Sequence, residues 1–346
     1  MTEQEPFYSV LVVNYNGRHH LEGCLGSLMN QTYQNFEMVL VDNASTDGSK
    51  EFMRERYPWV HLVEAEKNLG FTGGNNLGLR FTKGEWVIFL SNDVLLEPNW
   101  LEKMACFLNS DSQLGACGCK MINFYNPSVI DIIGLRIDKF GFPHLIGHSE
   151  KDEGQYDLFK DELFISGCCF LIKREVLEKL DEAFDPDYFA LGEDLDLSWR
   201  IKLLGYRLKI NTVTKAYHKS GSTFKALGKK LNTRYLSERN TIRSLLKNYS
   251  TSSLLKVMIP YFILWSAEVL FFFFTLRPKM ATGVIKAMGW NLLHLKETLA
   301  KRKRIQQTRV VGDDSLRDFF VSGSEKIRIL KGLESKLKML FPPRLK

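Results

Sequence analysis

Three short polar clusters, each directly after an apolar run, hold the residue types best suited to chemistry in this sequence. They are residues 41–47 (Val-Asp-Asn-Ala-Ser-Thr-Asp), 91–93 (Ser-Asn-Asp) and 192–197 (Gly-Glu-Asp-Leu-Asp-Leu). The runs before the first two clusters are short and rich in β-branched or aromatic residues, as buried parallel strands are. Ligands of open α/β sheets bind beyond the carboxyl ends of such strands. Two carboxylates there, with a third acidic cluster downstream, predict a site for a nucleotide and a metal ion.

The first hundred residues alternate between strand and helix patterns, which predicts an α/β fold with a mostly parallel, doubly wound sheet. A glycine-rich loop at residues 68–76 opens the third of the predicted helices. The predicted strands are residues 8–13, 36–41, 60–63 and 86–90, and the predicted helices are 21–28, 46–57 (capped by Thr46 or Asp47) and a helix that ends near Lys83.

The region from residue 100 to 218 is less regular. We predict strands at 116–122 and 164–172, and a loop-rich stretch between them through Glu162. Helices are expected near 100–108, 174–180 and 194–204, with Gly205 ending the last of them.

The last 120 residues change character. Residues 257–276 are almost continuously apolar and reach the length of about 20 residues that crosses a bilayer. Pro260 and Glu268 interrupt this run, and a carboxylate at mid-bilayer is costly. A buried helix of a C-terminal domain is one reading. We favour a monotopic hairpin or interfacial helix, followed by an amphipathic segment at 281–295 and rimmed by basic residues. Those basic residues are Lys256, Arg277, Lys279 and 301–304.

Composition narrows the class of protein. The 346 residues are 45% hydrophobic and 25% charged, which excludes global disorder, and the net charge is +7. No nucleic-acid motif accompanies the basic stretches, so we expect no nucleic-acid partner and favour an anionic membrane surface. The polar N-terminus predicts no secretory signal. Six cysteines without C-x-x-C spacing suit a reducing cytoplasm and argue against zinc; they are Cys24, Cys106, Cys117, Cys119, Cys168 and Cys169.

Six segments in order give a resemblance to a known family. They are residues 9–17 (Ser-Val-Leu-Val-Val-Asn-Tyr-Asn-Gly), the Asp42 cluster, the 68–76 loop, Ser-Asn-Asp at 91–93, Ser-Gly-Cys-Cys at 166–169 and Gly-Glu-Asp at 192–194. Over residues 7–220 the chain resembles the family 2 glycosyltransferases, which have the GT-A nucleotide-sugar fold. A loop like Asn-Leu-Gly-Phe at 68–71 makes it similar to the rhamnosyltransferase-type members.

The resemblance implies a nucleotide-sugar pocket. Asp42 matches the family residue that hydrogen-bonds the pyrimidine, with Asn43 nearby, and Val13 and Tyr15 would line the same pocket. The loop would contribute Asn68, Asn75 and Asn76. From its sequence neighbours alone, Asp42 is equally a turn or N-cap residue.

Ser91-Asn92-Asp93 stands at the place of the family's D-x-D-type motif. The resemblance implies that Asp93 binds Mg²⁺ or Mn²⁺, that Asn92 contacts the donor, and that His218 joins the metal shell. Asn92 replaces an acidic residue present in some members, so metal binding without nucleotide should be weak. The plainer readings are a capping role for Asp93 and a structural His218.

Asp194 matches the family's catalytic base. An inverting displacement needs one carboxylate to take the acceptor proton, and general-base help is worth about 10²–10⁴-fold. The plainer reading of this cluster is an acidic helix N-terminus favoured by the dipole. Glu193 and Asp196 suit that reading, and Asp196 is also placed to orient Arg200.

Together these features predict an inverting, metal-dependent glycosyltransferase that moves one sugar from a nucleoside-diphosphate sugar, dTDP-rhamnose being the example favoured. The acceptor is expected to be lipid-linked or a polysaccharide. The protein is expected to act at the cytoplasmic face of the membrane, as a peripheral or monotopic protein. Ser-Glu-Arg-Asn at 237–240 stands where processive synthases carry Q-x-x-R-W. The expected domains are a GT-A catalytic domain at 1–225, with a nucleotide half (1–99) and an acceptor half (100–225), and a helical region at 226–346.

Two other functions remain open at this point. A sugar nucleotidyltransferase would need a glycine-rich basic loop after the first strand, where this chain has Val-Asn-Tyr-Asn at 13–16. A non-catalytic nucleotide- or glycan-binding scaffold would bind the donor without turning it over.

Overall fold

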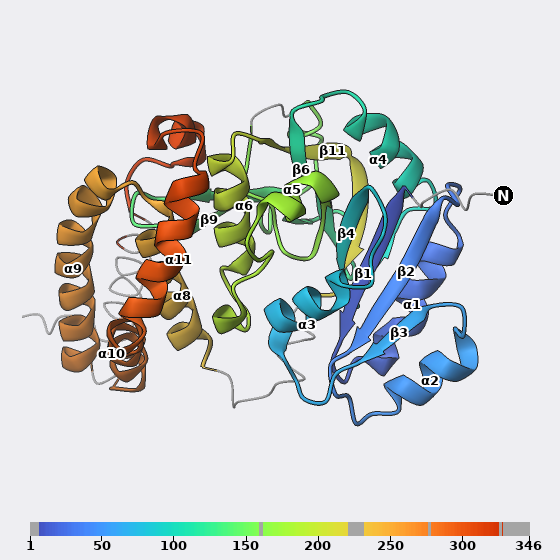
Figure 1. The fold of residues 1–346 in the computed structure, drawn as a ribbon, viewed down its shortest axis with the longest axis horizontal. Helices are drawn as coiled ribbons and strands as arrows, with labels where there is room; N and C mark the ends of the chain where they lie inside the picture. Colours follow the sequence, from blue (N-terminus) through green and yellow to red (C-terminus); the bar gives the residue numbers. More distant parts are fainter. Residues whose placement is uncertain (1–6, 159–161, 221–231, 276–277, 325–326, 328–346) are drawn as a thin grey trace, which may run out of the picture. The chain divides into compact units, whose positions relative to one another are not determined.

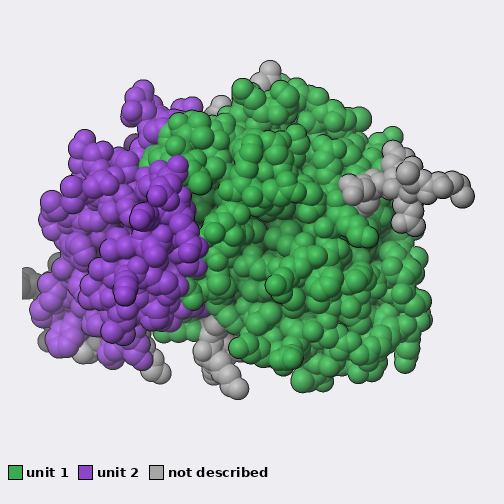
Figure 2. Space-filling model, in the orientation of Figure 1, with its two compact units in different colours: residues 1–135, 145–233, 308–311 green, residues 136–144, 234–307, 312–346 purple. Residues whose placement is uncertain are grey.

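The computed structural model describes residues 7–158, 162–220, 232–275, 278–324 and 327. The chain forms two compact units (Figure 2). Unit 1 comprises residues 1–135, 145–233 and 308–311, and unit 2 comprises 136–144, 234–307 and 312–346. The domain boundary expected between residues 225 and 226 lies outside the described residues.

Four parallel strands begin the large sheet of unit 1, in the order β3-β2-β1-β4 (Figure 1). Their bounds are β1 Tyr8–Asn14, β2 Phe36–Asp42, β3 His61–Glu64 and β4 Trp86–Ser91. The register aligns Asn14 with Asp42, and Val13 with Ser91. The carboxyl ends of β1, β2 and β4 therefore meet at one edge, where two of the three polar clusters begin.

The crossover helices follow the predicted order with shifted ends. They are α1 Arg18–Met29, α2 Ser49–Arg56 and α3 Gly70–Leu79. Leu21, Leu25 and Leu28 are buried on one face of α1, as the pattern predicts. The N-cap of α2 is Gly48 rather than Thr46 or Asp47, and α3 ends at Leu79, before Lys83.

The second half of the sheet is mixed and continues in the order β4-β10-β6-β11-β5. β10 is antiparallel to both of its neighbours, whereas β6 and β11 are parallel to each other. The strands are β5 Val94–Leu96, β6 Leu114–Asn123, β7 Ile130–Ile132, β10 Cys169–Lys173 and β11 Arg207–His218. The helices here are α4 Trp100–Leu108, α5 Arg174–Lys179, η1 Pro186–Tyr188 and α6 Glu193–Leu203.

This half departs from the sequence prediction in two ways. The strand predicted at 164–172 is shorter, because Phe164 makes only an isolated bridge to Leu135 before β10 begins at Cys169. The stretch predicted as loop contains β7 and the two-stranded sheet of β8 Gly134–Ile137 and β9 Pro143–Ile146.

One buried cation is built into unit 1. Lys120 on β6 has a side chain that is 0% exposed. Its Nζ lies 3.0 Å from Asp152 Oδ1 and 2.5 Å from Asp157 Oδ1. Because an unpaired charge at this depth would be strongly destabilising, the two carboxylates are needed for β6 to keep a lysine there.

The described residues of unit 2 form four successive helices and a 3₁₀ turn. They are α8 Thr233–Asn248, α9 Thr251–Phe274, α10 Pro278–Leu293, α11 Leu295–Thr308 and η3 Asp313–Phe319. Phe272 of α9 packs against Ala281 and Val284 of α10, and the two helices lie side by side (Figure 1).

Helix α9 contains the apolar run and is long and apolar enough to cross a membrane, although only 17% of its most apolar window is buried. Its one carboxylate, Glu268, does not face outward: it is 2% exposed and is paired with Arg234 of α8. Tyr261 is buried on the same side and donates a hydrogen bond to Glu238 (3.2 Å). Glu268 is thus part of a buried polar contact, and the exposed residues of α9 are mostly apolar. Arg277 and the Lys279 side chain lie outside what the structure describes.

Candidate active site

Asn14 joins the ends of three strands at the sheet edge. Its side chain is fully buried. Its Nδ2 donates to Asp42 Oδ2 (3.3 Å), and its Oδ1 accepts from Asn92 Nδ2 (2.7 Å). The first two polar clusters are therefore connected through the last residue of β1. Sequence reasoning missed Asn14, although its position at the end of the central strand was the available signal.

Asp42 is fully buried at the end of β2. Its Oδ1 accepts a hydrogen bond from Ser45 N (2.8 Å), which is the contact of a turn residue. Together with the bond from Asn14, this engages both carboxylate oxygens within the protein.

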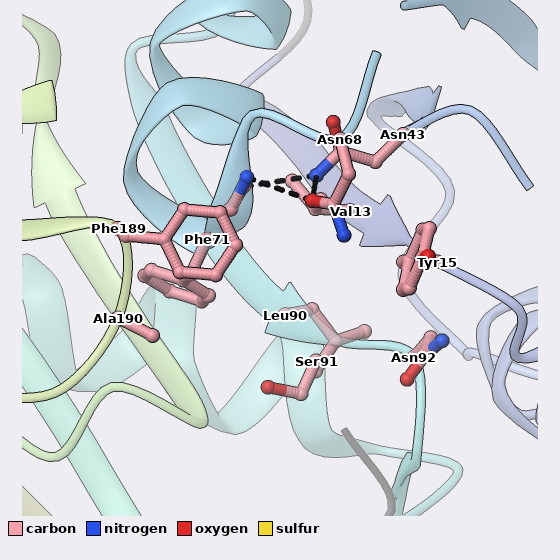
Figure 3. Close-up of a pocket in the computed structure, with 11 residues that line it drawn as sticks. Val13, Tyr15, Asn43, Asn68, Phe71, Leu90, Ser91, Asn92, Phe189 and Ala190 are labelled. Carbon is pink, nitrogen blue, oxygen red and sulfur yellow. Dashed lines mark hydrogen bonds between the residues drawn. The ribbon is translucent and has the colours of Figure 1, made fainter. Parts of the chain in front are cut away.

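Asn43, the next residue, holds the glycine-rich loop in place. Its Nδ2 donates to Asn68 Oδ1 (3.0 Å) and to Gly70 O (2.9 Å), and its Oδ1 accepts from Leu69 N (2.9 Å). Figure 3 shows Asn43 and Asn68 side by side at the rim of a cavity. Because Asn43 is 1% exposed, these bonds replace the water contacts that its amide loses on burial.

A recess of about 580 Å³, counting the space open to solvent, lies at the carboxyl ends of β1 and β4 (Figure 3). Five residues predicted from the sequence line it, namely Val13, Tyr15, Asn43, Asn68 and Asn92. The other lining residues are Gly70, Phe71, Leu90, Ser91, Phe189 and Ala190.

The remaining predicted donor residues have other contacts and do not line this recess. Asn75 is 2% exposed and its Nδ2 donates to Phe71 O (2.9 Å) within α3. Asn76 Nδ2 donates to Phe184 O (2.7 Å), and its Oδ1 accepts from Phe184 N (3.1 Å). Both asparagines fix the helix that follows the loop.

Phe189 and Ala190 form one wall of the recess. Neither residue was predicted from the sequence. Phe189 has φ of 61° and Leu191 has φ of 73°, in the left-handed region that side chains rarely adopt. The carbonyl of Phe189 accepts from Phe71 N (2.8 Å) at the start of α3. A Cβ on Gly70 would lie 2.5 Å from that carbonyl oxygen, so only glycine permits this close approach.

Asp93 and His218 are brought together by pairing of β5 with β11, which aligns His218 with Val94. His218 Nε2 lies 3.4 Å from Asp93 Oδ1, and His218 Nδ1 lies 2.7 Å from Asp131 Oδ2 on β7. Burial alone would lower the pKa of His218. Cys168 and the two carboxylates outweigh that effect and raise it. Sequence reasoning did not find Asp131.

The pair fits a divalent cation whose remaining ligands come from elsewhere. Carboxylate oxygen suits Mg²⁺ and Mn²⁺, and imidazole suits divalent transition-metal ions, to which Mn²⁺ belongs. Neighbouring ligands of an octahedral ion at about 2.1 Å lie about 3 Å apart, close to the separation of these two atoms. Within the described residues, no group of three or more His, Cys, Asp and Glu side chains is arranged to hold a metal. Two protein ligands alone would hold such an ion weakly, so the metal affinity expected without nucleotide stays low.

Asp194 lies at the N-terminus of α6 and is tied to the same region through the backbone. Its Oδ2 accepts from Gly167 N (3.0 Å) and its Oδ1 from Leu195 N (2.8 Å). The next residue, Cys168, accepts from Ser91 N (2.9 Å) at the end of β4 and its thiol contacts His218. The third polar cluster therefore joins the region of Asp93 and His218.

Its neighbour Glu193 is 9% exposed, and its Oε2 has no hydrogen-bond partner among the residues that the structure describes. Burial, and then the charge of Asp194, raise the pKa of Glu193 to about 8. Asp196 instead forms an ion pair, in which its Oδ2 accepts a hydrogen bond from Arg200 Nε (2.9 Å). Burial also raises the pKa of Asp194, and its backbone N–H bonds oppose this rise because they favour the charged form.

The comparisons with solved structures agree with this fold. A mannosyltransferase from Pyrobaculum calidifontis, solved with GDP-Man and Mn²⁺, superposes with a TM-score of 0.52 at 18% identity and covers 98% of this chain and 82% of that one. GalNAc-T7, solved with UDP, GalNAc and Mn²⁺, gives 0.56 at 18% identity over 72% of this chain and 49% of that one. At this identity the likeness shows the fold alone, and the predicted GT-A fold is confirmed.

Curated relatives match parts of the chain. An uncharacterized glycosyltransferase of Haemophilus influenzae is 29% identical over 34% of this chain and 37% of its own length. The O-antigen biosynthesis protein RfbC of Myxococcus xanthus is 25% identical over 64% of this chain and 18% of its own length. The putative teichuronic acid biosynthesis glycosyltransferase TuaG of Bacillus subtilis is 30% identical over 40% of this chain and 54% of its own length. The chain thus spans between 18% and 54% of the length of these relatives.

The model of the family described as "Glycosyl transferase family 2" matches residues 9–181, which is half of the chain. That span contains nearly all of β1 to β4, every residue that lines the recess except Phe189 and Ala190, and also Asp93 and the β10 strand. This match, the GT-A fold and the expectation drawn from the polar clusters agree, and the chain belongs to glycosyl transferase family 2.

Proposed function

We propose that this chain transfers one sugar from a nucleoside-diphosphate sugar to an acceptor in glycan or polysaccharide biosynthesis. One observation carries the proposal: an open recess at the ends of β1 and β4, with the Asp93–His218 pair at the edge of the same sheet. Family membership supplies the reaction class, and relatives named for O-antigen and teichuronic acid biosynthesis support the polymer context.

The donor would bind with its base and ribose against Val13, Tyr15 and Asn68, beside the aromatic ring of Phe71. Asn43 would act by holding the loop and Asn92 by facing the donor from the end of β4. For Asp42 we propose a role through the turn that presents Asn43, since its carboxylate is already hydrogen-bonded at both oxygens.

Asp93 and His218 would hold Mg²⁺ or Mn²⁺ together with the donor's diphosphate. When bound, the ion neutralises charge that develops on the leaving diphosphate. Asp194 would accept the proton of the acceptor hydroxyl while the hydroxyl oxygen bonds to the sugar carbon and the nucleoside diphosphate leaves from the opposite face. This single displacement inverts the sugar carbon. The two backbone hydrogen bonds of Asp194 fix the carboxylate and favour its charged form, and the protonated Glu193 keeps a second charge away from it.

The finer proposal is a dTDP-rhamnose donor and a lipid-linked or polysaccharide acceptor at the cytoplasmic face of the membrane. The Asn-Leu-Gly-Phe loop supports the donor, because Asn68, Gly70 and Phe71 all line the recess. The exposed face of α9 supports membrane association, because Glu268 is buried on the other side and large apolar side chains dominate the exposed residues. The exposed large apolar residues of α9 are Leu255, Ile259, Phe262, Ile263, Leu270, Phe273 and Phe274.

Donor turnover tests the function. Purified protein is incubated with a panel of nucleoside-diphosphate sugars and Mn²⁺, and release of nucleoside diphosphate is measured. Asp194→Asn should abolish transfer with donor affinity nearly unchanged. Asp318→Asn, an exposed aspartate of unit 2, is the matched control. Donor binding with no turnover of any sugar, with acceptor extracts present, would favour a non-catalytic scaffold instead.

Vesicle flotation tests the membrane proposal. Replacing Ile259, Phe262 and Phe273 by serine should release the protein from anionic vesicles without unfolding it, because these side chains are exposed. Wild-type protein that stays with the soluble fraction would refute membrane association.

A further inference from the structure

The two ring nitrogens of His218 face two different carboxylates. Nε2 lies toward Asp93 at 3.4 Å, and Nδ1 lies 2.7 Å from Asp131 Oδ2. The imidazole side chain is 12% exposed and that of Asp131 is 13% exposed, so water competes little for either group. The shorter contact is the stronger one, and it involves the nitrogen that points away from Asp93.

The backbone of β7 aims Asp131 at this ring. β7 is antiparallel to β6, and its register pairs Met121 with Ile132 and then Ile122 with Ile130. Asp131 is therefore the extra residue at an irregularity in the ladder. Such a bulge turns a side chain away from the regular alternation, and bulges are frequent beside functional sites.

The second oxygen of Asp131 is fixed as well. Ser220 Oγ donates to Asp131 Oδ1 (2.9 Å) and lies 3.1 Å from His218 Nδ1. Ser220 has φ of 42°, a left-handed conformation that places its hydroxyl next to both groups. With both oxygens engaged, the Asp131 carboxylate presents one fixed acceptor to the histidine.

We propose that Asp131 is a positioning residue that fixes the tautomer and direction of the His218 ring. An Nδ1–H that donates to Asp131 leaves the lone pair of the neutral imidazole on Nε2, the nitrogen that faces Asp93. Carboxylates that hold a metal-binding histidine in this way typically change metal affinity by about 10–100-fold when removed. The inference rests on the proposed function, because it assigns Asp131 to the Asp93–His218 metal site.

Binding of Mn²⁺ tests the inference without any turnover. Free Mn²⁺ is measured by its EPR signal in titrations of full-length protein with saturating dTDP. We expect Asp131→Ala to weaken Mn²⁺ binding about 10–100-fold and Asp131→Asn to weaken it less, because an amide oxygen still accepts from Nδ1–H. Affinity for dTDP without metal should not change. Asp318→Asn is the matched control, and circular dichroism confirms that each variant is folded.

A spectroscopic measurement separates positioning from general support of the fold. In protein labelled with ¹⁵N-histidine, the His218 signals are assigned by their loss in His218→Gln. With saturating dTDP and Mg²⁺, wild type should show a His218 Nδ1–H proton that exchanges slowly with water, because Asp131 accepts from it, and Asp131→Ala should lose this protection.

The outcomes separate this inference from the function beneath it. Asp131→Ala that binds Mn²⁺ like wild type, while Asp93→Asn does not, would overturn the role of Asp131 alone. Wild type that binds no Mn²⁺ or Mg²⁺ with any nucleoside diphosphate would overturn the metal site, and this inference with it.

Discussion

Replacement of Asn43 tests whether one buried amide holds the glycine-rich loop against the end of β2. In Asn43→Ala, the bonds to Asn68 Oδ1, Gly70 O and Leu69 N are all lost. Asn68 Oδ1 keeps its bond from Gly70 N (2.8 Å), whereas the other two groups lose a partner. At about 0.5–1.5 kcal/mol for each net bond, the expected cost is about 3 kcal/mol.

Asn43→Asp is the sharper variant because it keeps the shape. Its carboxylate can still accept from Leu69 N, but it cannot donate to the oxygens that lie 3.0 and 2.9 Å from the wild-type Nδ2. At pH 7 we expect Asn43→Asp to cost at least as much as Asn43→Ala. The difference should shrink as the pH falls toward about 4, where a protonated aspartic acid donates again.

Local hydrogen exchange is the assay of choice, because a chain with two units does not have to unfold in one step. Exchange of the peptide containing Leu69 and Phe71 should accelerate by up to about 100-fold in Asn43→Ala, as the estimated cost implies. Asn109→Ala, at an exposed asparagine that ends α4, is the control. Protection of that peptide unchanged from the control would refute the idea that Asn43 holds the loop.

Three further predictions follow from buried contacts. Gly70→Ala should weaken donor binding more than tenfold in a thermal-shift titration with dTDP, because its Cβ would meet the Phe189 carbonyl at 2.5 Å; unchanged affinity would show that the wall can move. Burial alone would raise the pKa of Asp152, but hydrogen bonds from two lysines hold it at about 2, so its contribution to stability is present above about pH 4 and disappears as the pH falls toward 2. Asp152→Asn should therefore lower the free energy of unfolding, measured by urea denaturation, by about 2 kcal/mol at pH 7 and by much less at pH 2. The cost is not larger because Lys120 keeps the carboxylate of Asp157. Burial and the charge of Asp194 raise the pKa of Glu193 to about 8, so wild type should lose stability relative to Glu193→Gln between about pH 4.5 and 8, by at most about 1.4 kcal/mol per pH unit; parallel profiles would contradict that pKa.

The first four strands could be predicted because each is a short apolar run next to a helix pattern, so local periodicity was sufficient. β7, β8 and β9 could not, since these segments of three or four residues have no helix pattern beside them, unlike the equally short β3. β11 was missed for another reason: its register is interrupted between Asn211 and Lys215, and its partner β6 lies about 90 residues earlier.

Within the site, the residues that could be predicted are those that lie close to the end of a strand. Val13, Tyr15 and Asn92 were expected from the family resemblance, and they line the recess because they lie at or just beyond the ends of β1 and β4. Asp131 and Phe189 carried no comparable signal. One depends on a bulge in an unpredicted strand, and the other on a left-handed backbone that no local motif encodes.

The left-handed backbone at Phe189 and Leu191 has a consequence for protein engineering. Each such residue costs about 1 kcal/mol or more relative to glycine, so a library screened only for heat resistance should collect glycine at both positions. A library screened for turnover should retain the aromatic side chain at 189, because it lines the recess. The two selections should therefore give different amino acids at position 189, glycine for thermostability and an aromatic residue for catalysis.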